Sequence, residues 1–374
     1  MCKVKNIAIN AWVLRNKNID GIGNFTIQTT IQLALLNPGQ HYYVLVDWNY
    51  KENYFLGYSN IHTKRIFPPW RHPLLYITIL DTILPLFLII NKIDTLIGMD
   101  GMLSLLTKKK QIAVIHDLNF YHYPKFLPLR NRFFYNTFYP LYAKKANKIA
   151  TVSNFSKRDI ISTYKIDENK INVVYCAAKN IYHPIVEKEK QIIRNKYTNG
   201  NPYFLCIGTI HPRKNIENTI KAFKLFLNKK TYNFKLVLVG DFLWNNSSIF
   251  NLIDELGVKN DIIILGRIKD EELNNILASA NALVFMSFFE GFGIPILEAF
   301  ATHTPVICSN TTSLNEISGN AALKVDPYNV KEISNKMLEL VDSESRREKL
   351  ITLGTVELNQ YSWERTAESI NQII

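Results

Sequence analysis

The chain has 374 residues, of which 47% are hydrophobic and 20% are charged, and its formal net charge is +12. This length exceeds what one hydrophobic core usually supports, and the composition is that of a folded protein, so we expect two domains and exclude a largely disordered chain. The four cysteines lack pairing or metal-ligand spacing, and the apolar N-terminal stretch is too short for a secretory signal, so we expect a cytoplasmic protein.

Short apolar runs alternate with helical patterns along the chain, a rhythm that indicates βαβ units and parallel sheets. In the first half, the predicted strands are Val4–Asn10, Tyr42–Val46, Thr95–Gly98, Gln111–Ile115, Lys148–Val152 and Asn172–Cys176. In the second half, they are Tyr203–Ile207, Lys235–Val239, Ile262–Leu265, Ala282–Met286, Pro305–Cys308 and Ala322–Val325. Helical spacing predicts helices over Glu217–Leu227 and Asp270–Ala280.

The segment Leu74–Ile90 is almost wholly apolar but contains Asp81 and Pro85. These interruptions and its short length make it a poor membrane span, so we predict a buried helix. The alternative is a monotopic membrane contact, supported by the neighbouring residues Trp70–His72.

The weakest pattern of strands and helices is Ala177–Asn201, which contains Pro184 and a charged run at 187–190. We place the connection between the domains there, so the N-terminal domain covers 1–182 and the C-terminal domain 183–360. Residues 1–180 carry 23 Lys and Arg against 10 Asp and Glu, a net charge of +13, whereas the remainder carries 21 against 22, or −1. Such asymmetry suggests that the basic half meets an anionic membrane, a phosphorylated acceptor or nucleic acid.

The strongest motif follows the predicted strand Ala282–Met286 and opens a helix near Pro295, a residue favoured in the first helical turn. Its two glycines permit backbone geometry closed to other residues and leave room for a ligand near the helix amides. One carboxylate on the loop and a second in the helix suit the hydroxyls of a transferred sugar and of a ribose. The residues that we expect to bind are Glu290, Gly291, Phe292, Gly293, Ile294 and Glu298.

A second motif, Gly208–Asn215, follows the first strand of the second domain. Its adjacent cations Arg213 and Lys214 stand at the carboxyl end of a strand, where open α/β sheets bind ligands. They suit a diphosphate and the charge that it carries as it leaves. Gly208 and Thr209 complete this predicted binding segment.

The first domain offers weaker motifs. Gly21 and Gly23 stand between the first strand and an amphipathic helix, where they would bring amides near the phosphates, although a plain turn fits equally well. His116 follows the strand Gln111–Ile115 and suits either a sugar hydroxyl or a structural hydrogen bond. Ser153 suits the N-cap of a helix.

The sequence lacks an Asp-x-Asp motif, a P-loop, a Gly-x-Ser-x-Gly elbow, a Gly-x-Gly-x-x-Gly fingerprint and a zinc-type cluster. We therefore expect side chains and helix ends, without a metal or a cofactor, to meet the charge of the leaving diphosphate.

Together these motifs resemble the retaining glycosyltransferases of family 4, whose fold is called GT-B. The resemblance covers essentially the whole chain, and its pieces are Gly208–Asn215, Glu290–Ala299, Val306–Ile317, Gly319–Ala322, Asp326–Pro327 and Tyr361–Glu364. It implies an α/β protein of two Rossmann-like domains whose parallel sheets face a central cleft, with the acceptor on the side of the first domain and the nucleotide-sugar donor on the side of the second. A last segment, 361–374, would cross back to the first domain.

The resemblance also implies roles for single residues. Glu290 would contact the donor sugar, Glu298 the nucleotide ribose and Lys214 the phosphates, while His116 matches a histidine near the donor sugar. Many members have an arginine where this chain has Thr209, and Arg213 is the candidate to replace it.

The patterns are most similar to those of bacterial surface-polysaccharide mannosyltransferases. We therefore expect GDP-mannose as the donor, ahead of other hexoses, a saccharide or lipid-linked saccharide as the acceptor, and no nucleic acid partner. The basic N-terminal domain would make peripheral contact with the inner face of the cell membrane. Two alternatives stay open: a nucleotide-sugar 2-epimerase of the same architecture, and a non-catalytic nucleic-acid-binding protein.

Overall fold

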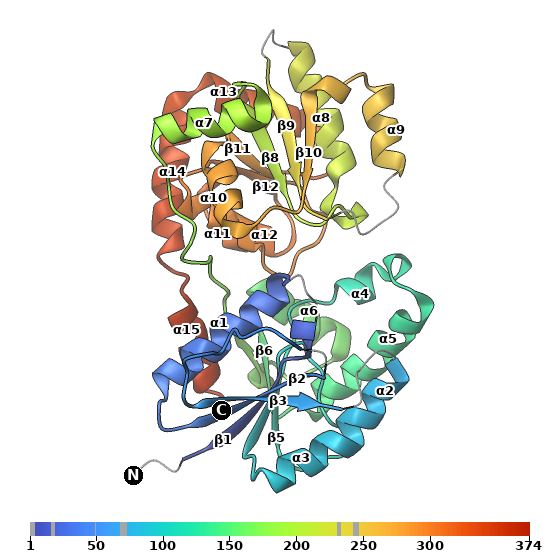
Figure 1. Cartoon of the computed structure of the whole chain (residues 1–374). Helices are drawn as coiled ribbons and strands as arrows, with labels where there is room; N and C mark the ends of the chain where they lie inside the picture. The colour runs from blue at the N-terminus through green and yellow to red at the C-terminus, as the bar shows by residue number, and fades with distance from the viewer. Residues whose placement is uncertain (1–3, 16–18, 49, 68–72, 230–232, 242–246) are drawn as a thin grey trace. The chain divides into compact units, whose positions relative to one another are not determined.

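The computed structural model describes residues 4–15, 19–48, 50–67, 73–229, 233–241 and 247–374, and the chain divides into two compact units (Figure 1). Unit 1 runs to Cys176 and also contains Ser362–Ile374, whereas unit 2 is Ala177–Tyr361. The sequence predicts the boundary at residue 182. The contacts divide the chain earlier, because residues 177–183 pack against unit 2.

Unit 1 is built on a parallel sheet of seven strands in the order β3-β2-β1-β4-β5-β6-β7. Their bounds are β1 Asn6–Asn10, β2 His41–Asp47, β3 Ile61–Ile66, β4 Thr95–Gly98, β5 Lys110–Val114, β6 Lys148–Thr151 and β7 Ile171–Val173. Ile7 pairs with Tyr42 on one side and with Thr95 on the other. The chain therefore builds outward in both directions from the β1/β4 position, which makes it the topological switch point where such sheets bind ligands.

Helices cover both faces of this sheet. They are α1 Gly21–Leu36, α2 Pro73–Thr78, α3 Leu84–Ile90, α4 Asn119–His122, α5 Leu129–Lys145, α6 Asn154–Tyr164 and α15 Trp363–Asn371, with short 3₁₀ turns at Trp12–Arg15, Pro124–Phe126 and Glu168–Lys170. The C-terminal α15 packs along α1, and the rings of Phe25 and Trp363 meet edge to face. The hydroxyl of Ser153 accepts a hydrogen bond from the Ser156 amide, so it is the predicted N-cap of α6.

The apolar segment Leu74–Ile90 forms α2, a π-helical turn at Ile79–Ile83 and α3. Ile79, Leu80, Leu84 and Leu88 are buried, as predicted, but Leu86, Ile89 and Ile90 are exposed. The carboxylate of Asp81 accepts hydrogen bonds from the amides of residues 105 and 106 and from a serine hydroxyl, which explains an acid within this segment. The neighbouring Trp70–His72 lies outside the described residues. Among the helices described, none combines the length and the apolar character needed to cross a membrane.

Unit 2 has a parallel sheet of six strands in the order β10-β9-β8-β11-β12-β13. The strands are β8 Tyr203–Ile207, β9 Lys235–Val239, β10 Ile262–Gly266, β11 Ala282–Phe285, β12 Val306–Ser309 and β13 Ala322–Val325. The helices are α7 Glu187–Thr198, α8 Ile216–Lys229, α9 Ser247–Glu255, α10 Asp270–Ser279, α11 Ile294–Ala301, α12 Thr312–Ile317, α13 Val330–Asp342 and α14 Glu344–Leu358, with 3₁₀ turns at Pro212–Lys214 and Lys259–Asp261. Its switch point lies between β8 and β11.

Two parts of the sequence interpretation are wrong. The segment Ala177–Asn201, taken as a connection without a clear element, contains α7, whose charged run lies on a mostly exposed helix. Strand β3 was missed because it is an edge strand, and Thr63, Lys64 and Arg65 are all exposed. An exposed edge strand lacks the apolar run that marks the inner strands of a parallel sheet.

Candidate functional site

The loop between β11 and α11 carries the strongest predicted motif. Gly293 has a φ of +107°, and a Cβ at this position would lie 2.6 Å from a Leu314 methyl group. Glycine is therefore required both by the backbone conformation and by the close packing. The Ser313 hydroxyl lies 2.8 Å from the Glu290 carbonyl oxygen and 2.9 Å from that of Phe292, which fixes the shape of the loop. The helix predicted near Pro295 begins at Ile294.

Glu290 lies on this loop, 8% exposed, between two cations from the loop that follows β8. Its carboxylate oxygens lie 2.6 Å from the Lys214 ammonium and 3.0 Å from the Arg213 guanidinium. Burial alone would raise the pKa of Glu290, but the two cations outweigh burial and hold it at about 2. The structure therefore brings together three residues that the two separate sequence motifs predicted.

The cation-bearing loop is itself held in place. Pro212–Lys214 forms a 3₁₀ turn that His211 caps, and Asn215 adopts a φ of +57° while its side-chain amide donates to the Pro327 carbonyl at 2.7 Å. Gly208, at a φ of +130°, lets the Lys214 side chain pass close by: a Cβ there would lie 3.3 Å from the Lys214 Cε. Thr209 is half-buried beside this turn.

Glu298 lies in the second turn of α11 and is 7% exposed. Burial raises its pKa to about 7, despite the nearby Lys179 and a hydrogen bond with the Tyr182 hydroxyl. Lys179 also forms an ion pair of 2.5 Å with Asp270. The sequence pattern does not indicate Lys179 or Tyr182, because both lie in the predicted connection Ala177–Asn201, where no periodic pattern marks them.

His116 follows β5 in unit 1, where its Nε2 lies 2.8 Å from the Met99 carbonyl oxygen. Its ring meets that of Phe25 edge to face at 4.9 Å. Burial lowers the pKa of His116, so the ring is neutral near pH 7 and Nε2 is the donor to the carbonyl. One ring nitrogen of His116 therefore makes a structural hydrogen bond, which is the alternative to sugar binding given above.

The predicted amides of Gly21 and Gly23 lie at the start of α1. Asp20 is the N-cap, and its carboxylate accepts a hydrogen bond of 2.8 Å from the Gly23 amide. The amide predicted to approach a phosphate is thus already bonded within its own helix cap.

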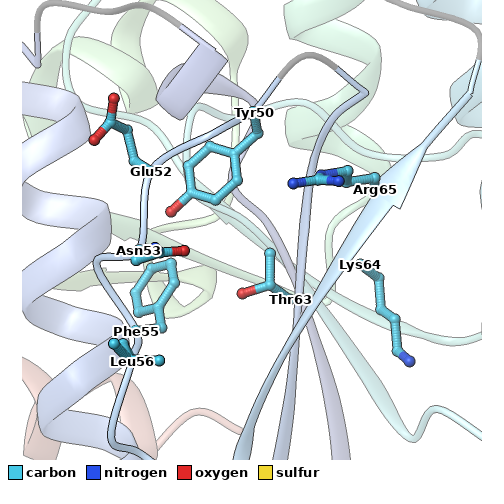
Figure 2. Close-up of a pocket in the computed structure, with 8 residues that line it drawn as sticks. All are labelled: Tyr50, Glu52, Asn53, Phe55, Leu56, Thr63, Lys64 and Arg65. Atoms are coloured by element: carbon cyan, nitrogen blue, oxygen red, sulfur yellow. The ribbon is translucent and has the colours of Figure 1, made fainter.

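The larger of two described pockets, about 440 Å³, lies in unit 1 between the Tyr50–Leu56 segment and β3 (Figure 2). Figure 2 shows the Tyr50 hydroxyl near Asn53 and the Thr63 hydroxyl directed to the same space. None of the predicted site residues lines this pocket. In the described part of the chain, no three His, Cys, Asp or Glu side chains cluster as metal ligands would.

Comparison with protein families matches both units. Residues 187–355 match the family described as "Glycosyl transferases group 1", and residues 31–178 match "Glycosyltransferase Family 4". The chain is 33% identical over 266 residues to O-antigen chain mannosyltransferase B of Escherichia coli, covering 70% of each chain. It is 31% identical over 225 residues to O-antigen chain mannosyltransferase RfbU of Salmonella typhimurium, covering 60% of this chain and 58% of that one. The epimerase alternative finds no support in these matches.

Solved structures confirm the predicted GT-B fold. Sucrose-phosphate synthase from Thermosynechococcus elongatus matches with a TM-score of 0.79 at 17% identity, covering 99% of this chain and 98% of that one. WaaG, a glycosyltransferase of lipopolysaccharide biosynthesis, matches with a TM-score of 0.75 at 15% identity, covering 98% and 99%. The Anabaena protein HepE, solved with UDP-glucose, gives a TM-score of 0.75 at 15% identity, covering 98% of both chains.

Proposed function

The chain belongs to the glycosyltransferases of family 4, and from this premise we propose that it transfers mannose from GDP-mannose, with retention of configuration, to a saccharide or lipid-linked saccharide. The names of its O-antigen relatives support mannose as the sugar and a role in surface-polysaccharide synthesis. The observation that carries the proposal is the cluster of the buried Glu290 with the partly buried Arg213 and Lys214 at the switch point of unit 2.

In this proposal, Arg213 and Lys214 bind the donor diphosphate. Both cations pair with Glu290, so a diphosphate that binds them competes with this carboxylate. The diphosphate wins this competition for the two cations, because it carries more negative charge than one carboxylate does. It also releases Glu290 to accept hydrogen bonds from hydroxyls of the sugar attached to that diphosphate.

Glu298 binds the ribose hydroxyls of the nucleotide. A nearly buried carboxylate can satisfy its acceptors with two neighbouring hydroxyl donors. The loop after β12 lies at the same edge of the sheet, and the buried hydroxyl oxygens of Thr311 and Thr312 have no hydrogen-bond partner among the described residues. These hydroxyls are further contacts for the nucleotide.

The proposed chemistry needs stabilisation of the leaving group rather than a protein nucleophile. As the bond between the sugar and the diphosphate breaks, Arg213, Lys214 and the start of α11 near Gly293 stabilise the developing charge, without a metal. The acceptor hydroxyl attacks the same face and passes its proton to the leaving phosphate. His116 contacts the donor sugar through the ring nitrogen that does not face Met99.

The test is thermal stabilisation of the full chain by GDP, UDP, ADP and dTDP, each with EDTA and with Mg²⁺. We expect a rise in Tm with GDP that does not require Mg²⁺, and a loss of that rise in Lys214→Ala. Glu290→Ala should abolish mannosyl transfer while the chain stays folded. A larger rise in Tm with another nucleotide would show that the donor carries that nucleotide instead of GDP. If no nucleotide raises the Tm and no transfer occurs, the proposal is refuted.

Contact with an anionic membrane is part of the proposal. It is supported by the charge of +13 on residues 1–180 and by the exposed Leu86, Ile89 and Ile90 at the end of α3. We expect the chain to sediment with vesicles that contain phosphatidylglycerol and not with neutral ones. Ile89→Glu combined with Ile90→Glu should weaken this binding, and unchanged sedimentation would remove α3 from the proposed surface.

A further inference from the structure

We propose that a stacked pair of aromatic rings in unit 2, Phe288 and Tyr328, is a platform that binds one sugar ring of the acceptor saccharide. The inference rests on the proposed function and extends it to the acceptor, for which the comparisons give no residue. The two ring centroids lie 4.6 Å apart, and the ring planes are inclined by 24°. Tyr328 is 68% exposed, so the part of its ring that Phe288 does not cover is open to solvent.

The two rings come from different loops at one edge of the sheet. Phe288 lies in the loop after β11, and Tyr328 lies in the loop between β13 and α13. Strand β12 pairs in parallel with both β11 and β13, so the carboxyl ends of the three strands meet at the edge where such sheets bind ligands. The pair therefore extends this edge from the Glu290 cluster, at β8 and β11, towards β13.

The platform is fixed to the turn that carries the two donor-binding cations. The Phe288 amide donates to the Arg213 carbonyl at 2.9 Å. Next to Tyr328, the Pro327 carbonyl accepts from the side-chain amides of Asn215, at 2.7 Å, and of Asn218, at 3.2 Å. Both rings are thus held beside the turn to which we assign the donor diphosphate, so a sugar on the platform lies near the donor by the structure of unit 2 alone.

The nucleotide of the donor takes a different direction from this cluster. Strands β8, β9 and β10 follow one another outward on one side of the switch point, and β11, β12 and β13 do so on the other side. Right-handed connections therefore place α8 and α11 on opposite faces of the sheet. Glu298, assigned to the ribose, lies in α11, whereas Tyr328 precedes α13, which packs on α8. A nucleotide that runs from the cluster to Glu298 leaves the platform to the other substrate.

The chemistry of the platform suits a pyranose. Apolar C–H groups cover the faces of the sugar ring and pack against an aromatic face, while the hydroxyls at its rim need hydrogen-bond partners. The Tyr328 amide donates to Asp326 Oδ1 at 2.9 Å, which holds the exposed Asp326 carboxylate beside the ring as an acceptor for such hydroxyls. An exposed ring does not enclose its ligand, so it suits a unit within a saccharide chain that continues beyond it.

The test removes the ring and then restores it. Tyr328→Ala removes the ring, Tyr328→Phe keeps it without the hydroxyl, and Phe250→Ala, which removes an exposed ring of α9 in the same unit, is the control. Mannotetraose is titrated into the full chain by saturation-transfer NMR. Mannosyl transfer from GDP-mannose to mannotetraose is then measured against the concentration of either substrate.

We expect Tyr328→Ala to raise the acceptor KM about fivefold to tenfold, as the loss of one aromatic stacking contact would, while the donor KM stays within about twofold. Tyr328→Phe and Phe250→Ala should keep both KM values within about twofold of the wild type. Because Tyr328 is exposed, its replacement by alanine should leave the Tm of the chain nearly unchanged.

Other outcomes overturn the inference. An unchanged acceptor KM in Tyr328→Ala would exclude the platform from acceptor binding, and an equal rise in the donor KM would mean that the ring only supports the Arg213 turn. An acceptor KM that Tyr328→Phe fails to restore would also overturn it. If no nucleotide raises the Tm and no transfer occurs, the proposed function fails, and the NMR titration alone decides. Mannotetraose signals that Tyr328→Ala abolishes would then keep the platform as a saccharide site, and signals that persist, or that the wild type lacks, would refute it.

Discussion

Replacing Glu298 by glutamine should stabilise the folded chain in alkaline solution while weakening its affinity for the nucleotide. The pKa of about 7 for Glu298, against 4.5 for an ordinary glutamate, means that ionisation is harder in the folded than in the unfolded chain. At pH 8.5, this difference corresponds to about 3 kcal/mol of stability lost to the buried charge. Glutamine removes the charge and still accepts the hydrogen bond from Tyr182.

The sign follows from the direction of the pKa shift. A carboxyl whose folded pKa is raised destabilises the fold above that pKa, and the penalty disappears as the pH falls through 7 towards 4.5. At pH 5, the gain from Glu298→Gln should therefore shrink to about 1 kcal/mol. For a unit of this size, about 2 to 4 °C of Tm corresponds to 1 kcal/mol, so we expect a rise of about 6 to 12 °C at pH 8.5.

The assay is thermal unfolding of both proteins from pH 5 to pH 8.5, with and without GDP. Glu290→Gln is the matched control, because the pKa of Glu290 is held at about 2. The ionised Glu290 therefore stabilises the fold in full above pH 4.5, and this stabilisation is lost as the pH falls towards 2. That variant should be less stable at both pH values. For Glu298→Gln, an equal rise in Tm at pH 5 and pH 8.5, or a fall in Tm at pH 8.5, would refute the conclusion that the buried charge of Glu298 destabilises the fold.

Three further changes test other parts of the site. Gly293→Ala should lower the free energy of unfolding by about 3 kcal/mol, measured in urea, because the Cβ meets Leu314 and the φ is positive; a loss below about 1 kcal/mol would contradict this. Thr312→Gly should raise the stability by about 1 kcal/mol, since the β-branched Thr312 has a φ of +56°, and a lower urea midpoint would argue against strain there. Ser313→Ala should loosen the Glu290 loop, which we would detect as faster amide exchange at Gly291 and Phe292 with little change in α14.

The inner strands could be predicted from the sequence because both of their faces are covered. Three inner strands have the predicted bounds: Thr95–Gly98, Tyr203–Ile207 and Lys235–Val239. A strand buried on both faces must be apolar throughout, so its limits are visible in the residue types. Helix α7 escaped notice for the opposite reason: it is polar and largely exposed, and its stability comes from packing on α10 rather than from its own pattern.

The site could be predicted only where its chemistry is local in the sequence. Glu290, Arg213 and Lys214 stand in loops after recognisable strands, so the sheet topology alone brings them to one edge. The partners of Glu298 could not be found in this way. Tyr182 reaches it from a segment more than a hundred residues away, and a lone tyrosine there carries no periodic signal.

A comparison of the two units shows why the sequence predicts the fold in more detail than the function. Both place loops of similar origin at a switch point, after β1 and β4 in unit 1 and after β8 and β11 in unit 2. The backbone topology is therefore the same, and the difference in ligand must come from side chains. In unit 2 these loops carry Glu290 with two cations, whereas in unit 1 they carry Arg15 and Asp100 among aromatic rings. Exchanging charges between these loops, rather than rebuilding either sheet, is the change that should alter what each unit binds.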